Sequence, residues 1–325
     1  MTSQAIACAG LFSIAAIKQI QERAMLYGLD IGGTKMELAV LDLEHNKIVS
    51  KRLPTPTDSY DAFKKNIREL VFETDRELNT RGSVGIGIPG FVNPDTGKAL
   101  CANVPCANGQ NLQVDLELLL DRPIKIENDA NCFALSEAIG GAGDKISTVF
   151  GVILGTGCGG GLYINGKIHD GRNNLAGEWG HTPLPYHVFK LAGEDFPIVK
   201  CGCGMHGCLD NYLSGRGLEL TYKHVAGESR SGKDIVQLYR HHDARAERAV
   251  EIYCELLASG LGAMINILDP GVIVLGGGLS NFDELYELIP PLLPKYTLNI
   301  GQLPEIRKAE FGDAGGVRGA AMLNA

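Results

Sequence analysis

Residues 26–36, Leu-Tyr-Gly-Leu-Asp-Ile-Gly-Gly-Thr-Lys-Met, decide how the chain folds. The first six are mostly apolar and predict a buried strand, Leu26–Ile31, which ends at a pair of glycines suited to a tight turn. Two further apolar runs, Met36–Leu43 and Ile48–Leu53, predict strands separated by a polar turn. Three consecutive strands with short connections predict an antiparallel opening to a sheet.

The rest of the first half alternates helices with strands. Residues 59–79 place Phe63, Ile67 and Leu70 at helical spacing, with charged residues on the other face. Further strands are expected at Ser83–Ile88 and Ile124–Glu127, and further helices at Leu112–Leu120 and Asp129–Gly140. This alternation predicts a mixed α/β lobe.

The second half repeats the opening theme. Thr148–Leu154 is an apolar strand, residues 155–161 (Gly-Thr-Gly-Cys-Gly-Gly-Gly) form a turn, and Leu162–Ile164 returns as a strand. The later elements are expected to be a helix at Glu247–Leu268, a strand at Val272–Leu275, a glycine turn at 276–278, a helix at Phe282–Ile289 ended by two prolines, and a last helix at Gly315–Leu323. Two halves with matching hairpins predict two α/β lobes that face a cleft.

We expect the boundary between the lobes in the glycine-rich stretch at 140–145. Residues 25–143 then form a small N-terminal lobe and residues 144–310 a large C-terminal lobe. Residues 311–325 are expected to form a helix that packs back near the small lobe. Residues 1–24 are interpreted as an upstream extension that is disordered or not native, because a strand begins directly after Met25.

The composition narrows the class of protein. The 30 basic and 38 acidic residues give a net charge of −8, which excludes a generally basic nucleic-acid binder. The 42 glycines among 325 residues, well above the usual share, point to tight turns or close approach to a ligand. Nine cysteines, an odd number and mostly scattered, fit a reducing compartment. The apolar run at 5–17 is too short to cross a bilayer, so we expect a soluble, cytoplasmic protein.

Three glycine turns, at 32–34, 155–161 and 276–278, are candidate phosphate cradles, because backbone N–H groups without a nearby Cβ can point at an anion. None matches the P-loop or the dinucleotide fingerprint. Any one alone is more often an ordinary turn. The three together, with an aspartate, a threonine and a lysine beside the first, favour a nucleotide: Asp30 for Mg²⁺ through water, and Thr34 and Lys35 for phosphate oxygens.

The segment Glu127-Asn128-Asp129 stands at the junction of a strand and a helix. It has two interpretations. Asn128 or Asp129 fits the cap of the helix. A carboxylate here can also act as the general base that accepts a proton from an attacking hydroxyl. The sequence pattern leaves both open.

Three cysteines, Cys201, Cys203 and Cys208, lie within eight residues. In a reducing compartment this cluster favours zinc over disulfides. A tetrahedral Zn²⁺ site needs a fourth ligand, and both His206 and His181 are candidates.

The segment Asp30-Ile-Gly-Gly-Thr-Lys35 resembles the first phosphate motif of the ROK family (repressors, open reading frames and sugar kinases). The turns at 155–161 and 276–278 resemble the family's second phosphate motif and its adenosine-side motif. The resemblance runs from about residue 25 to the end. It implies the two-lobed actin-like ATPase and sugar kinase (ribonuclease H-like) fold, with a cleft between the lobes and a zinc-stabilised loop.

The resemblance also assigns roles to residues. It implies that Asp129 is the catalytic base and that a structural zinc is held by His181, Cys201, Cys203 and Cys208. It implies sugar contacts at Gly90, Asn103, Asn128, Asp129, Glu178, His181 and Asp210. It implies ATP contacts at Gly28, Asp30, Gly32, Gly33, Thr34, Lys35, Gly155, Thr156, Gly157, Gly159, Gly160, Gly276 and Gly277. Asp210 departs from the family, which commonly has glutamate there, so its reach is one methylene shorter.

The motifs are most similar to those of family members that phosphorylate the 6-hydroxyl of N-acetyl-D-glucosamine with ATP and Mg²⁺. The small residues at 106–109, after Asn103, leave room for a substituent on the sugar's C2. Glucose, N-acetylmannosamine and fructose remain alternative substrates. A sugar-sensing repressor is the alternative from another class, but only about 25 residues precede the first phosphate motif, too few for a three-helix DNA-binding unit. The expected partners are a sugar and ATP, without nucleic acid or membrane; a homodimer is left open.

Overall fold

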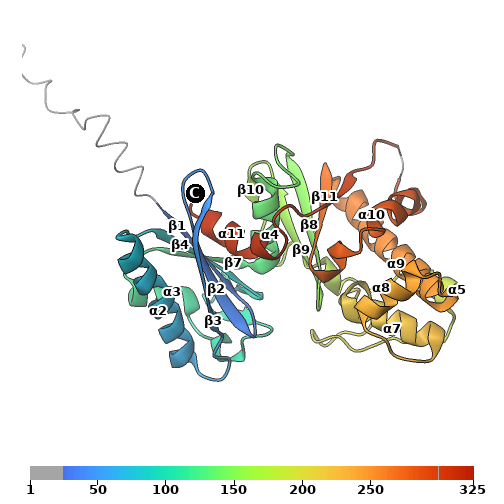
Figure 1. The fold of residues 1–325 in the computed structure, drawn as a ribbon, viewed down its shortest axis with the longest axis horizontal. Coiled ribbons are helices and arrows are strands. Elements are labelled where there is room, and N and C mark those ends of the chain that lie inside the picture. The colour runs from blue at the N-terminus through green and yellow to red at the C-terminus, as the bar shows by residue number, and fades with distance from the viewer. Residues whose placement is uncertain (1–24, 299) are drawn as a thin grey trace, which may run out of the picture.

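The computed structural model describes residues 25–298 and 300–325, so the expected extension at 1–24 lies outside the described residues. Within them, two five-stranded sheets flank a central pair of helices (Figure 1). The first sheet has the order β3-β2-β1-β4-β7 and the second β10-β9-β8-β11-β12. The predicted pair of α/β units is therefore present.

The first sheet follows the predicted hairpins. Strands β1 (Leu26–Ile31), β2 (Lys35–Leu41) and β3 (Lys47–Pro54) are antiparallel, and β4 (Ser83–Ile88) and β7 (Ile124–Asn128) run parallel to β1. The helices α2 (Tyr60–Leu78) and α3 (Leu112–Leu120) lie on the outer side (Figure 1). Helix α2 buries the predicted apolar face and begins at Ser59, whose side chain accepts a hydrogen bond from the Ala62 N–H.

The second sheet opens in the same way. Strands β8 (Thr148–Leu154) and β9 (Cys158–Ile164) form an antiparallel hairpin, and β11 (Val272–Gly276) runs parallel to β8. The sequence pattern did not indicate the edge strands β10 (Lys167–Ile168) and β12 (Glu305–Lys308). Both are short and lack a continuous apolar run, because edge strands are only partly buried.

The large lobe contains helices that the sequence analysis missed, namely α5 (Val188–Ala192), α6 (Asp210–Leu213), α7 (Gly215–Ala226) and α8 (Gly232–Arg240). They pack around α9 (Ala244–Leu268), which starts three residues before the predicted position because Asp243 caps it. Among the described helices, α9 alone is long and apolar enough to cross a membrane, and most of that stretch is buried in the core.

The helix expected at Phe282–Ile289 is wrong in extent. Only Leu285–Leu288 (α10) is α-helical, and the chain continues through the prolines as a 3₁₀ helix at Pro290–Lys295. Proline fits the first positions of such a turn, because the missing N–H has no partner there in any case. The two prolines therefore redirect the helix rather than end it.

The helices α4 (Asp129–Ala138) and α11 (Gly315–Met322) form the central layer between the two sheets (Figure 1). Glycines allow this close packing. A Cβ on Gly161 of β9 would lie 2.1 Å from the Ala130 carbonyl oxygen of α4, and a Cβ on Gly28 of β1 would lie 2.1 Å from the Val317 carbonyl oxygen of α11. Helix α11 thus packs against the sheet of the N-terminal half.

The chain crosses between the halves twice, once just after α4 and once just before α11. Both crossings contact Glu137, which is fully buried near the end of α4. Its carboxylate accepts hydrogen bonds from the N–H groups of Ala142 in the first crossing and of Glu310 and Phe311 in the second, at 2.9–3.0 Å. The predicted boundary at 140–145 therefore coincides with a crossing, but α4, which precedes it, packs on the second sheet as well.

The packing of Gly28 against α11 predicts that Gly28→Ala destabilises the protein by about 1–3 kcal/mol, since the new methyl group must displace backbone. The measurement is the thermal midpoint by circular dichroism. Gly301→Ala is the control, because no atom lies within 4 Å of a Cβ at Gly301. Equal midpoints for the two variants would contradict the packing argument.

Candidate active site

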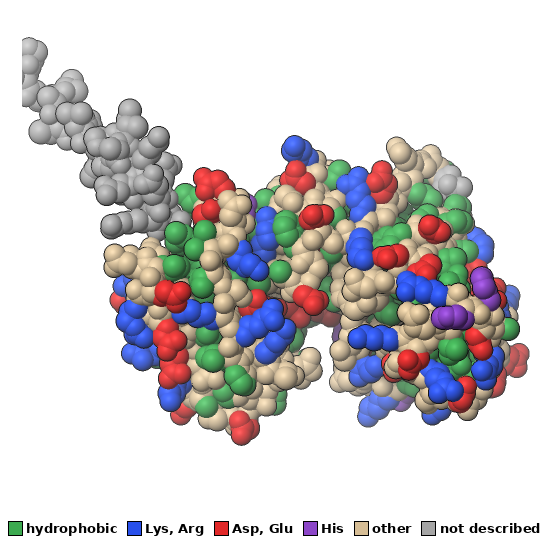
Figure 2. Space-filling view, in the orientation of Figure 1, with side chains coloured by type: hydrophobic (Ala, Val, Ile, Leu, Met, Phe, Trp, Pro, Cys, Tyr) green, Lys and Arg blue, Asp and Glu red, His purple; other side chains and the backbone are tan. Residues whose placement is uncertain are grey.

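A cleft of about 850 Å³ opens between the two halves, and the space-filling view is hollowed there (Figure 2). It is lined from the N-terminal half by Gly90, Asn103, Asn128 and Asp129, and from the C-terminal half by Gly155, Thr156, Gly157, Gly159, Gly160, Glu178, His181 and Asp210. All seven predicted sugar contacts therefore border one cavity, together with the second glycine turn.

Asp129 is the first residue of α4, and its neighbour caps the helix. The Asn128 side chain accepts hydrogen bonds from the N–H groups of Ala130 (2.8 Å) and Asn131 (3.2 Å), and donates one to the Gly90 carbonyl (3.1 Å). Because Asn128 takes the capping role, the Asp129 carboxylate remains partly accessible to the cleft. The cap interpretation therefore applies to Asn128, although the Asp129 Oδ1 also accepts a 2.8 Å hydrogen bond from the Ala130 N–H.

The environment of Asp129 suits a general base. Desolvation by the surrounding protein and the negative charge of Asp30 raise the pKa of Asp129 to about 7. Burial, with a contribution from Glu37, also raises the pKa of Asp30 to about 6, while Lys35 opposes the shift. The negative charge of Asp30 thus disfavours ionisation of Asp129, and carboxylate oxygens are the donors that fit a hard divalent cation such as Mg²⁺.

The first glycine turn joins β1 to β2 through a 2.9 Å hydrogen bond from the Gly32 N–H to the Lys35 carbonyl. It packs against the sugar-side segment, because a Cβ on Gly33 would lie 2.8 Å from the Asn103 carbonyl oxygen. Thr34 and Lys35 are exposed, and residues 32–35 do not border the cleft cavity itself.

Three of the predicted ATP contacts have packing roles. Gly28 faces α11 and does not border the cavity, so the structure gives it a packing role and its assignment to ATP stays a prediction. A Cβ on Gly276 would lie 2.6 Å from the Phe133 ring, and one on Gly277 would lie 2.7 Å from the Leu154 backbone. Gly276 and Gly277 therefore set the third turn directly against the strand that leads into the second.

The second glycine turn joins β8 to β9, and a 2.9 Å hydrogen bond from the Gly155 N–H to the Gly157 carbonyl closes it. Asp210 supports it from outside: its Oδ1 accepts a 2.7 Å hydrogen bond from the Cys158 N–H. A Cβ on Gly157 would lie 2.6 Å from that same oxygen, which is why glycine is needed there. One oxygen of the Asp210 carboxylate thus binds the turn, and the residue also borders the cleft.

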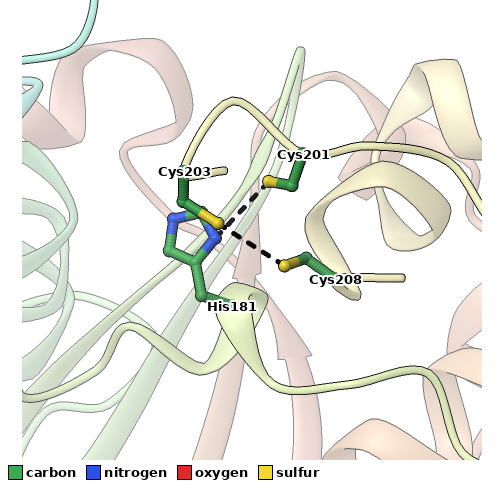
Figure 3. Close-up of side chains that lie close together, drawn as sticks. All are labelled: His181, Cys201, Cys203 and Cys208. Carbon is green, nitrogen blue, oxygen red and sulfur yellow. Dashed lines mark hydrogen bonds between the residues drawn. The ribbon is translucent and has the colours of Figure 1, made fainter. Parts of the chain in front are cut away.

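His181, Cys201, Cys203 and Cys208 converge on one point, as Figure 3 shows. Their ligand atoms lie within 4.8 Å of one another, with 3.6 Å from the His181 Nδ1 to the Cys201 Sγ and from the Cys203 Sγ to the Cys208 Sγ. Four ligands at about 2.3 Å from a tetrahedral Zn²⁺ lie about 3.7 Å apart, so this donor set fits zinc.

His181, and not His206, completes the cluster. His181 turns Nδ1 toward the cysteines, while its Nε2 lies 3.6 Å from the Glu178 carboxylate on the cleft side. Local spacing could not distinguish the two histidines. His206 instead takes part in a backbone bridge to Lys200 that shapes the cysteine loop.

Some cleft residues were missed. Asn108 lines the cavity and its side chain accepts a 2.6 Å hydrogen bond from the Cys101 N–H, and Met205 reaches the cavity from the cysteine loop. Glu127 accepts hydrogen bonds from the Asn128 N–H (2.7 Å) and the Asn131 side chain (3.0 Å), so it orients the segment that carries Asp129. Its place directly before Asn-Asp was the available sequence clue; Asn108 and Met205 stand in loops without a pattern.

Comparisons with known proteins agree with this geometry. Residues 26–325 match the model of the ROK family. The chain is 49% identical to an N-acetyl-D-glucosamine kinase of Pectobacterium atrosepticum and 51% identical to one of Pasteurella multocida, covering 92% of this chain and 99% of each relative. Its fold is similar to a ROK hexokinase from Thermus thermophilus (TM-score 0.80, 30% identity, 92% of this chain and 97% of that one).

A second solved structure, a ROK glucokinase from Streptomyces griseus in complex with glucose and AMPPNP, aligns with a TM-score of 0.74 at 27% identity and covers 92% of this chain and 99% of that one. The match to the family model spans all but the first 25 residues. The family and the two-lobed sugar kinase fold expected from the motifs are thus confirmed, and the chain belongs to the ROK family.

Proposed function

We propose that this protein is a soluble, cytoplasmic kinase that transfers the γ-phosphoryl group of ATP to the 6-hydroxyl of N-acetyl-D-glucosamine. The observation that carries the proposal is Asp129, a carboxylate with a pKa of about 7 that borders a cleft beside a glycine turn. The choice of sugar is supported by relatives about half identical over nearly their whole length that are named for this activity.

In this proposal the sugar lies against Asn103, Asn128, Glu178, His181 and Asp210, all of which border the cleft. Asp129 accepts the proton of the sugar hydroxyl as its oxygen attacks the γ-phosphorus. The new O–P bond forms while the bond between the γ-phosphorus and the bridging oxygen breaks, and ADP leaves with that electron pair. A pKa near the working pH lets Asp129 be ionised before the step and hold the proton after it.

In this proposal the nucleotide's phosphates lie along the glycine turns at 32–35 and 155–161, which resemble the family's two phosphate motifs. Asp30, half-buried near the end of β1, would hold Mg²⁺, which neutralises phosphate charge when bound. The zinc ligands have a different role from Asp129, because they would hold a structural ion and take no part in the proton transfer. His181 and the three cysteines would hold a structural zinc that fixes Glu178 and the cysteine loop at the cleft.

The first prediction concerns the substrate. With ATP and Mg²⁺, the purified protein should turn over N-acetyl-D-glucosamine with a higher kcat/KM than N-acetylmannosamine, glucose or fructose, because relatives about half identical to this chain are named for that activity. A coupled assay of ADP formation measures this. A preference for glucose would refute the sugar, and no turnover of any sugar would refute the kinase.

The second prediction concerns the base. Asp129→Asn should lower kcat by about 10²–10⁴-fold with little change in sugar binding, because the amide cannot accept the proton. In the wild-type protein, kcat/KM should fall as the pH drops below about 7, since protonation removes the base. Asp115→Asn, on the outer helix α3, is the control. A variant with near wild-type kcat, or a flat profile down to about pH 5, would contradict the role.

The third prediction concerns the metal. Cys203→Ser should reduce bound zinc, measured by elemental analysis, and lower the thermal midpoint, because the cluster loses one of four ligands. Cys106→Ser is the matched control, since Cys106 is half-buried and lies outside the cluster. Unchanged zinc content and stability in Cys203→Ser would rule out a structural metal here.

A further inference from the structure

The cleft carries an unbalanced charge. Its lining includes the carboxylates of Asp129, Glu178 and Asp210, and among the described residues that line it there is no lysine or arginine. The phosphates of a nucleotide are strongly negative, and phosphoryl transfer is accelerated by fixed positive charge near the transferring group. Any cationic side chain that adds to the charge of the Mg²⁺ ion therefore stands outside the residues that line the cavity.

The second glycine turn is held by the segment that follows the zinc ligand Cys208. Besides the bond from the Cys158 N–H to Asp210, the Gly215 N–H donates to the Gly155 carbonyl (2.9 Å). The Arg216 Nε donates to the Thr156 carbonyl (2.8 Å). Three contacts from residues 210–216 thus fasten three successive parts of the turn.

Arg216 is the one cation among the three residues that contact the turn, Asp210, Gly215 and Arg216. Most of its hydrogen-bonding capacity is unused. Its side chain is exposed, and Nε is its only nitrogen with a hydrogen bond to another described residue. No carboxylate within residues 25–298 and 300–325 lies close enough to form an ion pair with it. The two terminal nitrogens therefore carry an uncompensated positive charge beside Thr156, which lines the cleft.

From this placement we propose that Arg216 contacts the phosphates of the bound nucleotide, with its Nε fixed by the Thr156 carbonyl and its terminal nitrogens directed at phosphate oxygens. A guanidinium is suited to this because its planar donors match two phosphate oxygens at once. The inference rests on the proposed kinase function and adds a cationic ligand to the second turn, as Lys35 provides one beside the first.

A purely structural role for Arg216, as a latch on the turn, makes a different prediction. A latch needs only a donor for the Thr156 carbonyl, which Gln can supply without charge. A phosphate ligand needs the positive charge, which Lys supplies with poorer geometry. The pair Arg216→Gln and Arg216→Lys therefore separates the two roles.

The test is calorimetric binding of AMP, ADP and AMPPNP to the full chain with Mg²⁺, together with steady-state kinetics. Arg216→Gln should weaken AMPPNP at least about tenfold, with a smaller loss for ADP and the smallest for AMP, because each added phosphate adds negative charge. The KM for ATP should rise while the KM for the sugar stays within about twofold. Arg216→Lys should recover part of the affinity.

Lys223→Ala is the matched control, since it removes one exposed positive charge from the same helix, two turns further along. The inference is overturned if Arg216→Gln binds all three nucleotides like the wild type, or if its loss is equal along the series. Wild-type protein that binds no nucleotide would instead refute the kinase function on which the inference rests. The two failures are therefore distinguishable.

Discussion

The contact between backbones in the central layer is the constraint on which the rest of the structure depends. A Cβ on Gly319 of α11 would lie 1.7 Å from the Cys132 carbonyl oxygen of α4, and one on Gly85 of β4 would lie 1.9 Å from the Ala320 carbonyl oxygen. Only glycine permits such distances. Because α4 and α11 are locked together and to both sheets, the N-terminus of α4 is fixed at the cleft, and Asp129 with it.

That fixed position has an electrostatic consequence. The packing desolvates Asp30 and Asp129 on neighbouring elements. The charge of Glu37 further opposes ionisation of Asp30, and the charge of Asp30 opposes ionisation of Asp129, so both pKa values rise. The free protein holds unfavourable negative charge in the cleft, which a divalent cation and cationic side chains would relieve on binding. Binding of a nucleotide together with its cation would therefore be favoured by the relief of this negative charge.

Much of this architecture was predictable from the sequence, because hairpins, glycine turns and the apolar face of α2 are local patterns. What could not be predicted depends on contacts between distant segments. Gly28 stands in a motif that resembles a nucleotide-binding one, and only the position of α11, nearly three hundred residues later, shows that it also packs against a helix. Residue spacing alone left His181 and His206 open as zinc ligands; the family resemblance favoured His181, and the side-chain directions agree with it.

The cysteine cluster lies between the residues proposed to contact the sugar and the glycine turn proposed to contact the phosphates. His181 turns one ring nitrogen to the cluster and the other to Glu178, so the cluster fixes a group on the sugar side of the cleft. Two residues beyond Cys208, Asp210 binds the Cys158 N–H on the phosphate side. In the proposed function, a ligand set of four side chains therefore sets the distance between the loop that would contact the sugar and the turn that would contact the phosphates. In-line transfer depends on that distance, because reacting atoms a fraction of an ångström out of place lose rate steeply.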